Sequence, residues 1–261
     1  MQDAKAIGVF DSGVGGLSVL KHVRAQLPRV PLLYVADSGH VPYGDKTQDY
    51  IRERSLTLTE FLLRQGAAAV VIACNTATAA AAAMLRERIA VPIIGMEPAV
   101  KPAVSATRTG VVGVLATVGT LESARFAALL EQYAGDVEIV TQACPGLVEQ
   151  VEAGDLTSGT TRDLVAKYTR PLLDRGADTI VLGCTHYPFL RPSIAAVVGP
   201  AVQLIDTGEA VARQVVRRLP AALIGRIDSS AEERFWTTGN APAAARTMSR
   251  LWGAPVLVEG L

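Results

Sequence analysis

Residues 70–78 read VVIACNTAT, an apolar run rich in β-branched residues that leads straight into a stretch of small residues. This pattern predicts a buried strand followed by a helix, with Cys74 at the junction. The chain repeats the pattern at residues 179–186, TIVLGCTH, where Cys184 takes the corresponding place. The two strands and their cysteines align at a single offset, which indicates a site built from two related halves.

The composition fits a large aliphatic core. The chain has 261 residues, of which 49% are hydrophobic but only 5% aromatic, and this balance is typical of parallel sheets covered by helices. The formal net charge is zero, so it favours neither a nucleic-acid partner nor an anionic membrane surface. The tightest basic cluster, within residues 213–218, is more typical of a solvated helix face than of a binding patch.

Targeting and redox features indicate a cytoplasmic protein. Residues 1–6 lack the basic segment and apolar run of a signal peptide. No stretch approaches the roughly 18 uninterrupted apolar residues that would predict a membrane span. Three cysteines are too few, and odd in number, for a secreted disulfide framework. We therefore expect free thiols in a reducing cytoplasm and no membrane partner.

Strands and helices alternate along both halves of the chain, which predicts parallel sheets with crossover helices. The expected strands are residues 6–10, 31–36, 70–73, 91–98, 111–116, 137–140, 179–182, 203–205 and 234–239. One helix is expected directly after the first strand. The other main helices are expected at residues 47–65, 160–175, 209–219 and 242–252.

The expected fold class is α/β, with two pseudo-symmetric doubly wound lobes. We assign residues 1–98 and 208–261 to the first lobe, because the tail lies outside the repeat and is expected to pack back on that lobe. Residues 99–207 form the second lobe. Open α/β sheets bind ligands beyond the carboxyl ends of their strands, so we expect an active site between the lobes.

The paired thiols are the main candidates for chemistry. A thiol at a helix N-terminus is expected to have its pKa lowered from about 8.5, because the amide dipoles favour the thiolate. A thiolate can act as a general base, and a thiol can act as the matching acid. Cys74 and Cys184 on opposite faces of one molecule would suit a stereochemical inversion, in which one removes a proton from carbon and the other delivers one. Either cysteine alone could equally be a structural thiol.

Metal binding is a rival explanation for the thiols. Zinc requires three or four close ligands, and Cys74, Cys184 and His186 are the only candidate set. Since no CxxC or HxxxH spacing is present, we expect no metal site. Cys144 stands before Pro145 with no polar residue beside it, which favours packing in the core.

Two loops place an acidic residue between a strand and a helix. The loop at residues 11–16, DSGVGG, offers amide donors for a small anion, but it lacks the glycine and lysine signatures of nucleotide-binding loops. Asp11 or Ser12 could equally cap the helix, and both interpretations stay open. For Asp206, ahead of Gly208, a cap is favoured.

His186 lies two residues after Cys184, where it could tune that thiol or protonate a substrate oxygen. A lone histidine is usually structural, but this one stands at the expected ligand rim. His22, inside the first helix, and His40, in a loop, have no such context and are expected to be bystanders.

Together these segments closely resemble the bacterial glutamate racemases, of the cofactor-independent aspartate/glutamate racemase superfamily. The matching motifs span nearly the whole chain in the expected order, so their combination is highly specific. They are GVFDSGVGGL (8–17), VPYG (41–44), ACNTA (73–77), GVLATVGT (113–120), LGCTHYP (182–188) and IDTG (205–208).

The resemblance implies a two-base glutamate racemase that needs neither pyridoxal phosphate nor metal. Its product, D-glutamate, would feed peptidoglycan synthesis and thereby the cell wall and cell shape. Cys74 and Cys184 would be the acid/base pair, assisted by Asp11, His186 and Glu152. The implied substrate-binding residues are Asp11, Ser12, Tyr43, Gly44, Asn75, Thr76, Thr117, Thr120, Thr185 and His186. We also expect glutamate as the small-molecule partner, and a homodimer.

The chain departs from the family pattern in places. Residues 146–152 read GLVEQVE where relatives carry bulkier apolar residues, so Glu149 competes with Glu152 for the assisting role, although spacing favours Glu152. Gly39 and His40 stand where an Ala-Arg pair is common. Since the chain begins close to its first strand, we expect no N-terminal extension of the kind that some relatives use for activator binding.

Three alternatives stay open. A relative of the same superfamily could act on aspartate or a hydantoin, although residues 75–76 and 185–186 fit the glutamate group better. A non-catalytic protein could bind an amino acid between the lobes, but it would have no use for two matched thiols. A Cys-His hydrolase would release a product rather than change the optical rotation.

Overall fold

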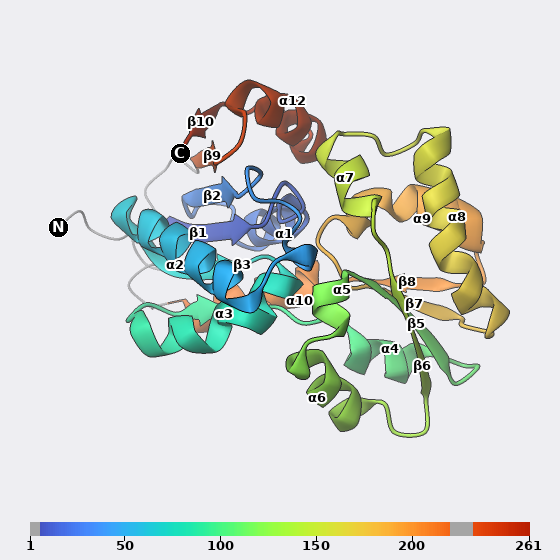
Figure 1. Ribbon diagram of the computed structural model, residues 1–261. Coiled ribbons are helices and arrows are strands. Elements are labelled where there is room, and N and C mark those ends of the chain that lie inside the picture. The colour runs from blue at the N-terminus through green and yellow to red at the C-terminus, as the bar shows by residue number, and fades with distance from the viewer. Residues whose placement is uncertain (1–5, 220–231) are drawn as a thin grey trace.

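The computed structural model describes residues 6–219 and 232–261, which form two α/β lobes, each around one parallel sheet (Figure 1). The sheet of the first lobe, sheet A, has the strand order β10-β9-β2-β1-β3-β4. Its strands are β1 (Ala6–Asp11), β2 (Leu32–Ala36), β3 (Ala67–Ile72), β4 (Ile93–Ile94), β9 (Glu233–Thr237) and β10 (Val258–Gly260).

The sheet of the second lobe, sheet B, has the order β6-β5-β7-β8. Its strands are β5 (Val111–Ala116), β6 (Glu138–Ala143), β7 (Thr179–Leu182) and β8 (Gln203–Ile205). All the strand pairs in both sheets are parallel. The predicted fold class, two α/β lobes with mainly parallel sheets, is confirmed.

Helices cover the sheets in both lobes (Figure 1). Those of the first lobe are α1 (Leu17–Gln26), α2 (Gln48–Arg64), α3 (Asn75–Arg88), α10 (Gly208–Arg218) and α12 (Ala241–Trp252). Those of the second are α4 (Val100–Ala106), α5 (Val118–Leu121), α6 (Ala124–Tyr133), α7 (Leu147–Glu152), α8 (Gly159–Asp174) and α9 (Arg191–Val198). Two short 3₁₀ turns, η1 (Tyr43–Asp45) and η2 (Tyr187–Leu190), lie beside the interlobe cavity described below.

Local signals explain where the long helices begin. Thr47, Ser158 and Asn240 each accept a hydrogen bond from the backbone N–H three residues on, which satisfies one of the free amides of the first turn. The predicted helices at 47–65, 160–175, 209–219 and 242–252 are found within a residue or two of these limits.

The tail contributes two strands to sheet A. β9 pairs with β2 along its whole length, and β10 pairs with β9. Helix α12 lies between them in the chain and packs against both strands. The division of the chain at residues 98 and 208 stays a prediction.

The expected strand at residues 91–98 is wrong in extent, because only Ile93 and Ile94 pair with β3. Pro92 and Pro98 lack the N–H that a ladder needs, which limits the strand. The short elements α4, α5, α7, α9 and β10 have no counterpart among the expected helices and strands.

One hydrophobic cluster runs through both lobes. It contains Leu20 and Met248 from the first lobe and Leu147 and Leu182 from the second, all less than 3% exposed. Two further clusters lie within single lobes. Because the largest cluster is shared, the apolar burial that stabilises each lobe depends on the other.

Two findings bear on the expected environment of the protein. None of the helices within residues 6–219 and 232–261 combines the length and the apolar character that a membrane crossing needs. Cys74, Cys144 and Cys184 are all buried and unpaired.

On α10, Arg213 forms an exposed ion pair with Glu209, as expected for a solvated helix face.

Candidate active site

A narrow cavity lies between the two lobes, and its free volume of about 10 Å³ is close to the least that can hold one water molecule. Both candidate thiols line it, Cys74 from the first lobe and Cys184 from the second. Of the other predicted site residues, Ser12, Tyr43, Gly44, Asn75, Thr76, Thr117, Thr120, Thr185 and His186 also line it. Asp11 and Glu152 lie behind this lining and contact it through hydrogen bonds.

The two thiols reach the cavity from the carboxyl ends of β3 and β7. Cys74 is the N-cap of α3, and its Sγ accepts a hydrogen bond from Ala77 N at 3.4 Å. The same sulfur donates to Ser12 Oγ at 3.8 Å. Cys184 follows Gly183, whose Cβ, if present, would lie 2.8 Å from a carbonyl oxygen of β5. Glycine therefore allows the chain to turn inward just before Cys184.

The pKa expected for Cys74 from its place at a helix N-terminus is wrong. Burial raises the pKa of this thiol, and the negative charge of Asp11 raises it further. The amide of Ala77 acts in the opposite direction, as the helix position predicts, but burial outweighs it. Cys74 is therefore a neutral thiol at rest, and its thiolate would be a stronger base than an ordinary cysteine.

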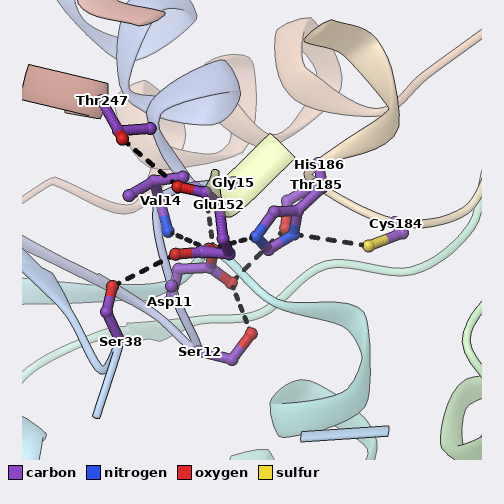
Figure 2. A network of polar contacts seen from close by, with 12 residues as sticks. Asp11, Ser12, Val14, Gly15, Ser38, Glu152, Cys184, Thr185, His186 and Thr247 are labelled. Carbon is purple, nitrogen blue, oxygen red and sulfur yellow. Dashed lines mark hydrogen bonds and ion pairs between the residues drawn. The ribbon is translucent and has the colours of Figure 1, made fainter. Parts of the chain in front are cut away.

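A chain of polar contacts leads away from Cys184 (Figure 2). His186 Nδ1 lies 3.6 Å from Cys184 Sγ, and its Nε2 lies 2.6 Å from Glu152 Oε1. Burial alone would lower the pKa of His186, but the hydrogen bonds to Cys184 and Glu152 hold it well above its usual value. The imidazole is therefore placed to carry a proton beside the Cys184 sulfur.

Glu152 belongs to α7 of the second lobe but contacts the loop after β1 in the first. Its Oε1 accepts a hydrogen bond from Val14 N at 2.7 Å, and its Oε2 accepts one from Ser38 Oγ at 3.3 Å (Figure 2). Glu149, the competing candidate, is exposed and has no contact with His186 among the hydrogen bonds of the described residues. The geometry thus favours Glu152 as the partner of the imidazole.

Asp11 lies fully buried at the end of β1. Its Oδ2 accepts a hydrogen bond from Gly16 N at 2.7 Å, and its Oδ1 lies 3.4 Å from Thr185 Oγ1 and 3.5 Å from Ser12 Oγ. Burial raises the pKa of this carboxyl group to about 6, against the opposing charge of His186. Asp11 therefore both caps the loop before α1 and carries charge next to the cavity. The amides of Val14 and Gly16, expected to be open to a small anion, bind protein carboxylates instead.

Neutral donors and acceptors from both lobes meet across the cavity. The hydroxyl of Thr76 lies 2.9 Å from that of Thr117 and 3.1 Å from that of Thr120. Asn75 Nδ2 donates to Gly183 O at 2.9 Å, while its buried Oδ1 has no partner within the described residues. Within that part of the chain no lysine or arginine lines the cavity, so an anionic ligand there would be held by hydroxyl and amide groups.

A buried network behind Tyr43 is absent from the sequence predictions. Tyr43 donates to Asp37 at 2.5 Å, and Arg54 holds the same carboxylate through two hydrogen bonds at 2.8 and 3.0 Å. Thr238 of the tail also donates to it at 2.8 Å. Asp37 directly follows β2, and Asp11 is the last residue of β1. This shared place at the end of a strand is the signal that could have revealed Asp37.

The remaining candidates lie elsewhere. Cys144 is buried in the shared hydrophobic cluster, in line with the expected packing role. Asp206 Oδ1 accepts a hydrogen bond from Gly208 N at 3.0 Å, as the expected cap would. His22 and His40 do not line the cavity. Throughout residues 6–219 and 232–261, no three His, Cys, Asp or Glu side chains gather in the way that a metal ion would need.

Two glycines allow the first-lobe loop to approach this cluster. A Cβ at Gly13 would lie 1.9 Å from Glu152 Oε1, and one at Gly15 would lie 2.3 Å from His186 Nδ1. Because both neighbours are held by hydrogen bonds, we expect Gly15→Ala to destabilise the fold by about 1–3 kcal/mol. Urea unfolding measures this. Gly159→Ala, at a position with no atom within 4 Å of the added carbon, is the matched control, and an equal effect of the two changes would contradict the prediction.

Comparison with known proteins agrees with this fold and cavity. The family model for Asp/Glu/hydantoin racemase matches residues 7–215. A glutamate racemase of Pseudomonas aeruginosa is 57% identical over 260 residues, which cover 99% of this chain and 98% of that protein.

Solved structures agree as well. The Escherichia coli glutamate racemase, in complex with L-glutamate and the activator UDP-MurNAc-ala, superposes with a TM-score of 0.87 at 31% identity, over 98% of each chain. The Francisella tularensis glutamate racemase, in complex with D-glutamate, gives 0.85 at 28% identity, over 99% of this chain and 98% of the other. The chain therefore belongs to the Asp/Glu/hydantoin racemase family of isomerases, and within it to the bacterial glutamate racemases.

Proposed function

We propose that the protein interconverts L- and D-glutamate by a two-base mechanism in which Cys74 and Cys184 exchange protons with Cα. The observation that carries this proposal is the entry of both thiols, one from each lobe, into a single narrow cavity. The family supports the reaction, and the two related complexes, with L-glutamate and with D-glutamate, support the substrate.

In each turnover one sulfur, as thiolate, removes the Cα proton while the other, as thiol, delivers a proton to the opposite face. The substrate gains and loses one proton, and the two sulfurs exchange protonation states. The buried environment that raises the pKa of Cys74 favours the thiol that delivers a proton. The thiolate left by that delivery is a stronger base than an ordinary cysteine toward the very weakly acidic Cα–H bond in the reverse reaction. The cavity is narrow, and exclusion of water around the bound substrate would strengthen the electrostatic interactions that stabilise the carbanion-like transition state.

The assisting residues divide between the two thiols. His186, oriented by Glu152, hydrogen-bonds Cys184 and can share its proton. Ser12 connects the Cys74 thiol to the Asp11 carboxylate, because its hydroxyl accepts a hydrogen bond from Cys74 Sγ and donates one to Asp11 Oδ1. Preorganised groups of this kind stabilise charge as it develops in the transition state.

Glutamate carries two carboxylates and one ammonium group, and neutral groups line the cavity. We assign Asn75, Thr76 and Thr185, at the helix starts beside the thiols, to the substrate carboxylates, together with the hydroxyls of Thr117 and Thr120. Ser12, Tyr43 and Gly44 complete the binding residues, and Asp11 and His186 supply charge nearby.

The cellular role follows from the product. D-Glutamate made by this reaction would feed peptidoglycan synthesis, as the family resemblance implies. A cytoplasmic location, supported by three unpaired cysteines, and a homodimer both stay predictions.

The decisive experiment is circular dichroism of L-glutamate incubated with protein freed of metals by a chelator and of cofactors by dialysis. The signal is expected to decay to zero as a racemate forms. L-Aspartate and a chiral hydantoin, run in parallel, test the neighbouring substrate classes. A constant glutamate signal, with no exchange of the Cα proton in deuterated water, would refute the enzyme and favour a binding protein.

The buried Asp11 predicts an acid limb in the pH dependence. Its pKa of about 6 means that the carboxylate is neutralised below that pH, so kcat/KM is expected to fall there as the charge near the cavity is lost. Asp11→Asn should lower kcat/KM at pH 8 and remove this limb. A limb that persists unchanged in the variant would assign it to another group.

The same burial predicts a stability change of opposite sign. A folded-state pKa raised from 3.8 to about 6 means that Asp11 stabilises the fold in its protonated form below about pH 4, and that this contribution is lost as the pH rises through 6. At pH 7.5 the ionised group therefore opposes folding, and Asp11→Asn should raise the free energy of unfolding by up to about 3 kcal/mol. Urea unfolding at pH 4 and pH 7.5 checks this, since the gain should vanish at the lower pH.

A further inference from the structure

Helix α12 belongs to the first lobe but also contacts the second. It packs against β9 and β10 of sheet A, and Figure 1 shows its far end beside α7. Two side chains on this helix donate hydrogen bonds across the lobe boundary. Thr247 Oγ1 donates to the carbonyl oxygen of Glu152 at 3.2 Å, and Arg250 Nη1 donates to that of Gly154 at 2.7 Å.

Both acceptors lie where α7 ends. The last carbonyls of a helix have no intrahelical partner and carry the negative end of its dipole, so a hydroxyl and a guanidinium group suit them well. Gly154, in the left-handed conformation with φ +75°, turns the chain so that its carbonyl reaches Arg250. The contact is therefore specific to these groups and is more than general packing.

The residue held in this way is Glu152 itself. Figure 2 shows Thr247 bonded to the backbone of Glu152, while the carboxylate of the same residue faces His186. Helix α7 has only six residues, so it has little rigidity of its own. The direction in which the Glu152 side chain leaves the backbone thus depends on what holds the end of α7.

We propose that Arg250 and Thr247 are positioning residues for the reaction, which hold the end of α7 so that Glu152 keeps its 2.6 Å contact with His186 beside Cys184. Neither residue touches the cavity. The inference rests on the proposed two-base function, but the placement of Glu152 can be tested separately from activity.

The test uses Arg250→Met, with Arg246→Met as the matched control. Arg246 lies one turn earlier on α12, and among the described residues its one side-chain hydrogen bond goes to the carbonyl oxygen of Pro242 on the same helix. Imidazole NMR is informative because the chain has three histidines, of which His22 and His40 serve as internal references. The ring resonances of His186 are expected to shift in Arg250→Met and to stay in place in Arg246→Met. Unshifted His186 resonances in both variants would overturn the proposal.

Kinetics provide the second measurement. A small misplacement of a catalytic group lowers kcat without removing substrate contacts, so Arg250→Met should lower kcat about tenfold with KM changed less than about threefold. Arg250→Lys, which keeps a donor and a positive charge, should recover most of the loss. A kcat for Arg250→Met within twofold of that for Arg246→Met would contradict the proposal.

Isotope effects separate positioning from a general structural defect. If proton transfer at Cys184 is slowed, the deuterium isotope effect on kcat/KM should rise for the α-deuterated enantiomer that Cys184 deprotonates and fall for the other. A general defect would move both effects together, and that result would overturn the inference. Wild-type protein that does not racemise glutamate would instead refute the proposed function, while the His186 resonances would still decide the positioning role.

Discussion

Replacing either Cys74 or Cys184 by serine is expected to lower the rate of glutamate racemisation by a factor of about 10²–10⁴, the usual contribution of a general acid or base. A serine hydroxyl has nearly the same shape as a thiol but loses its proton far less readily, so it cannot serve as the base. The measurement is the decay of the circular dichroism signal, started once from L-glutamate and once from D-glutamate.

The third thiol supplies the control for these variants. Cys144 is as buried as the other two and packs in the shared hydrophobic cluster, but it does not line the cavity, so Cys144→Ala should retain most of the activity. Proton NMR in deuterated water adds a second test, because both catalytic variants should also lose exchange at Cα. Wild-type rates in either Cys74→Ser or Cys184→Ser would refute the two-base assignment.

His186→Asn is expected to lower kcat by about 10²–10³, with a smaller effect on KM. The variant removes the group that lies 3.6 Å from the Cys184 sulfur and accepts or donates its proton. Glu152→Gln should lower kcat less, by about 10–10², because the imidazole remains but loses the carboxylate that orients it. Steady-state kinetics in both directions measure these effects.

Glu149→Gln is the matched control for Glu152→Gln. The two residues lie one helical turn apart on α7, and only Glu152 reaches the imidazole. Activity close to wild type is expected for the Glu149 variant. If Glu149→Gln were the more damaging of the two, the assisting role would belong to that residue.

Much of the fold could be predicted because its signals are local. The strands before Cys74 and Cys184 are buried runs of β-branched residues, and such runs are readable in the sequence without knowledge of their partners. β10 could not be found in this way, since its three residues form a strand only through pairing with β9. The reduction of the expected strand 91–98 to two residues likewise depends on where β3 offers partners.

The cavity residues were predictable to the extent that they follow strands or match family motifs. Asp37 was not predicted, because what distinguishes it is its hydrogen bonds with Arg54 and Thr238, and both residues are distant from it in the chain. The pKa of Cys74 was predicted in the wrong direction because sequence shows the helix start but not the degree of burial. The roles of the individual residues stay predictions until the variants are made.

The order of strands in sheet A has a consequence for synthesis on the ribosome. β2 pairs with β9, and roughly 200 residues separate the two in the chain. At about 5–20 residues per second, the nascent first lobe waits roughly 10–40 seconds for the strand that covers its open edge. The second lobe emerges complete during that interval. An unpaired edge is a site of aggregation, so chaperone demand should be greatest while β2 is exposed and should end once β9 and β10 have left the exit tunnel.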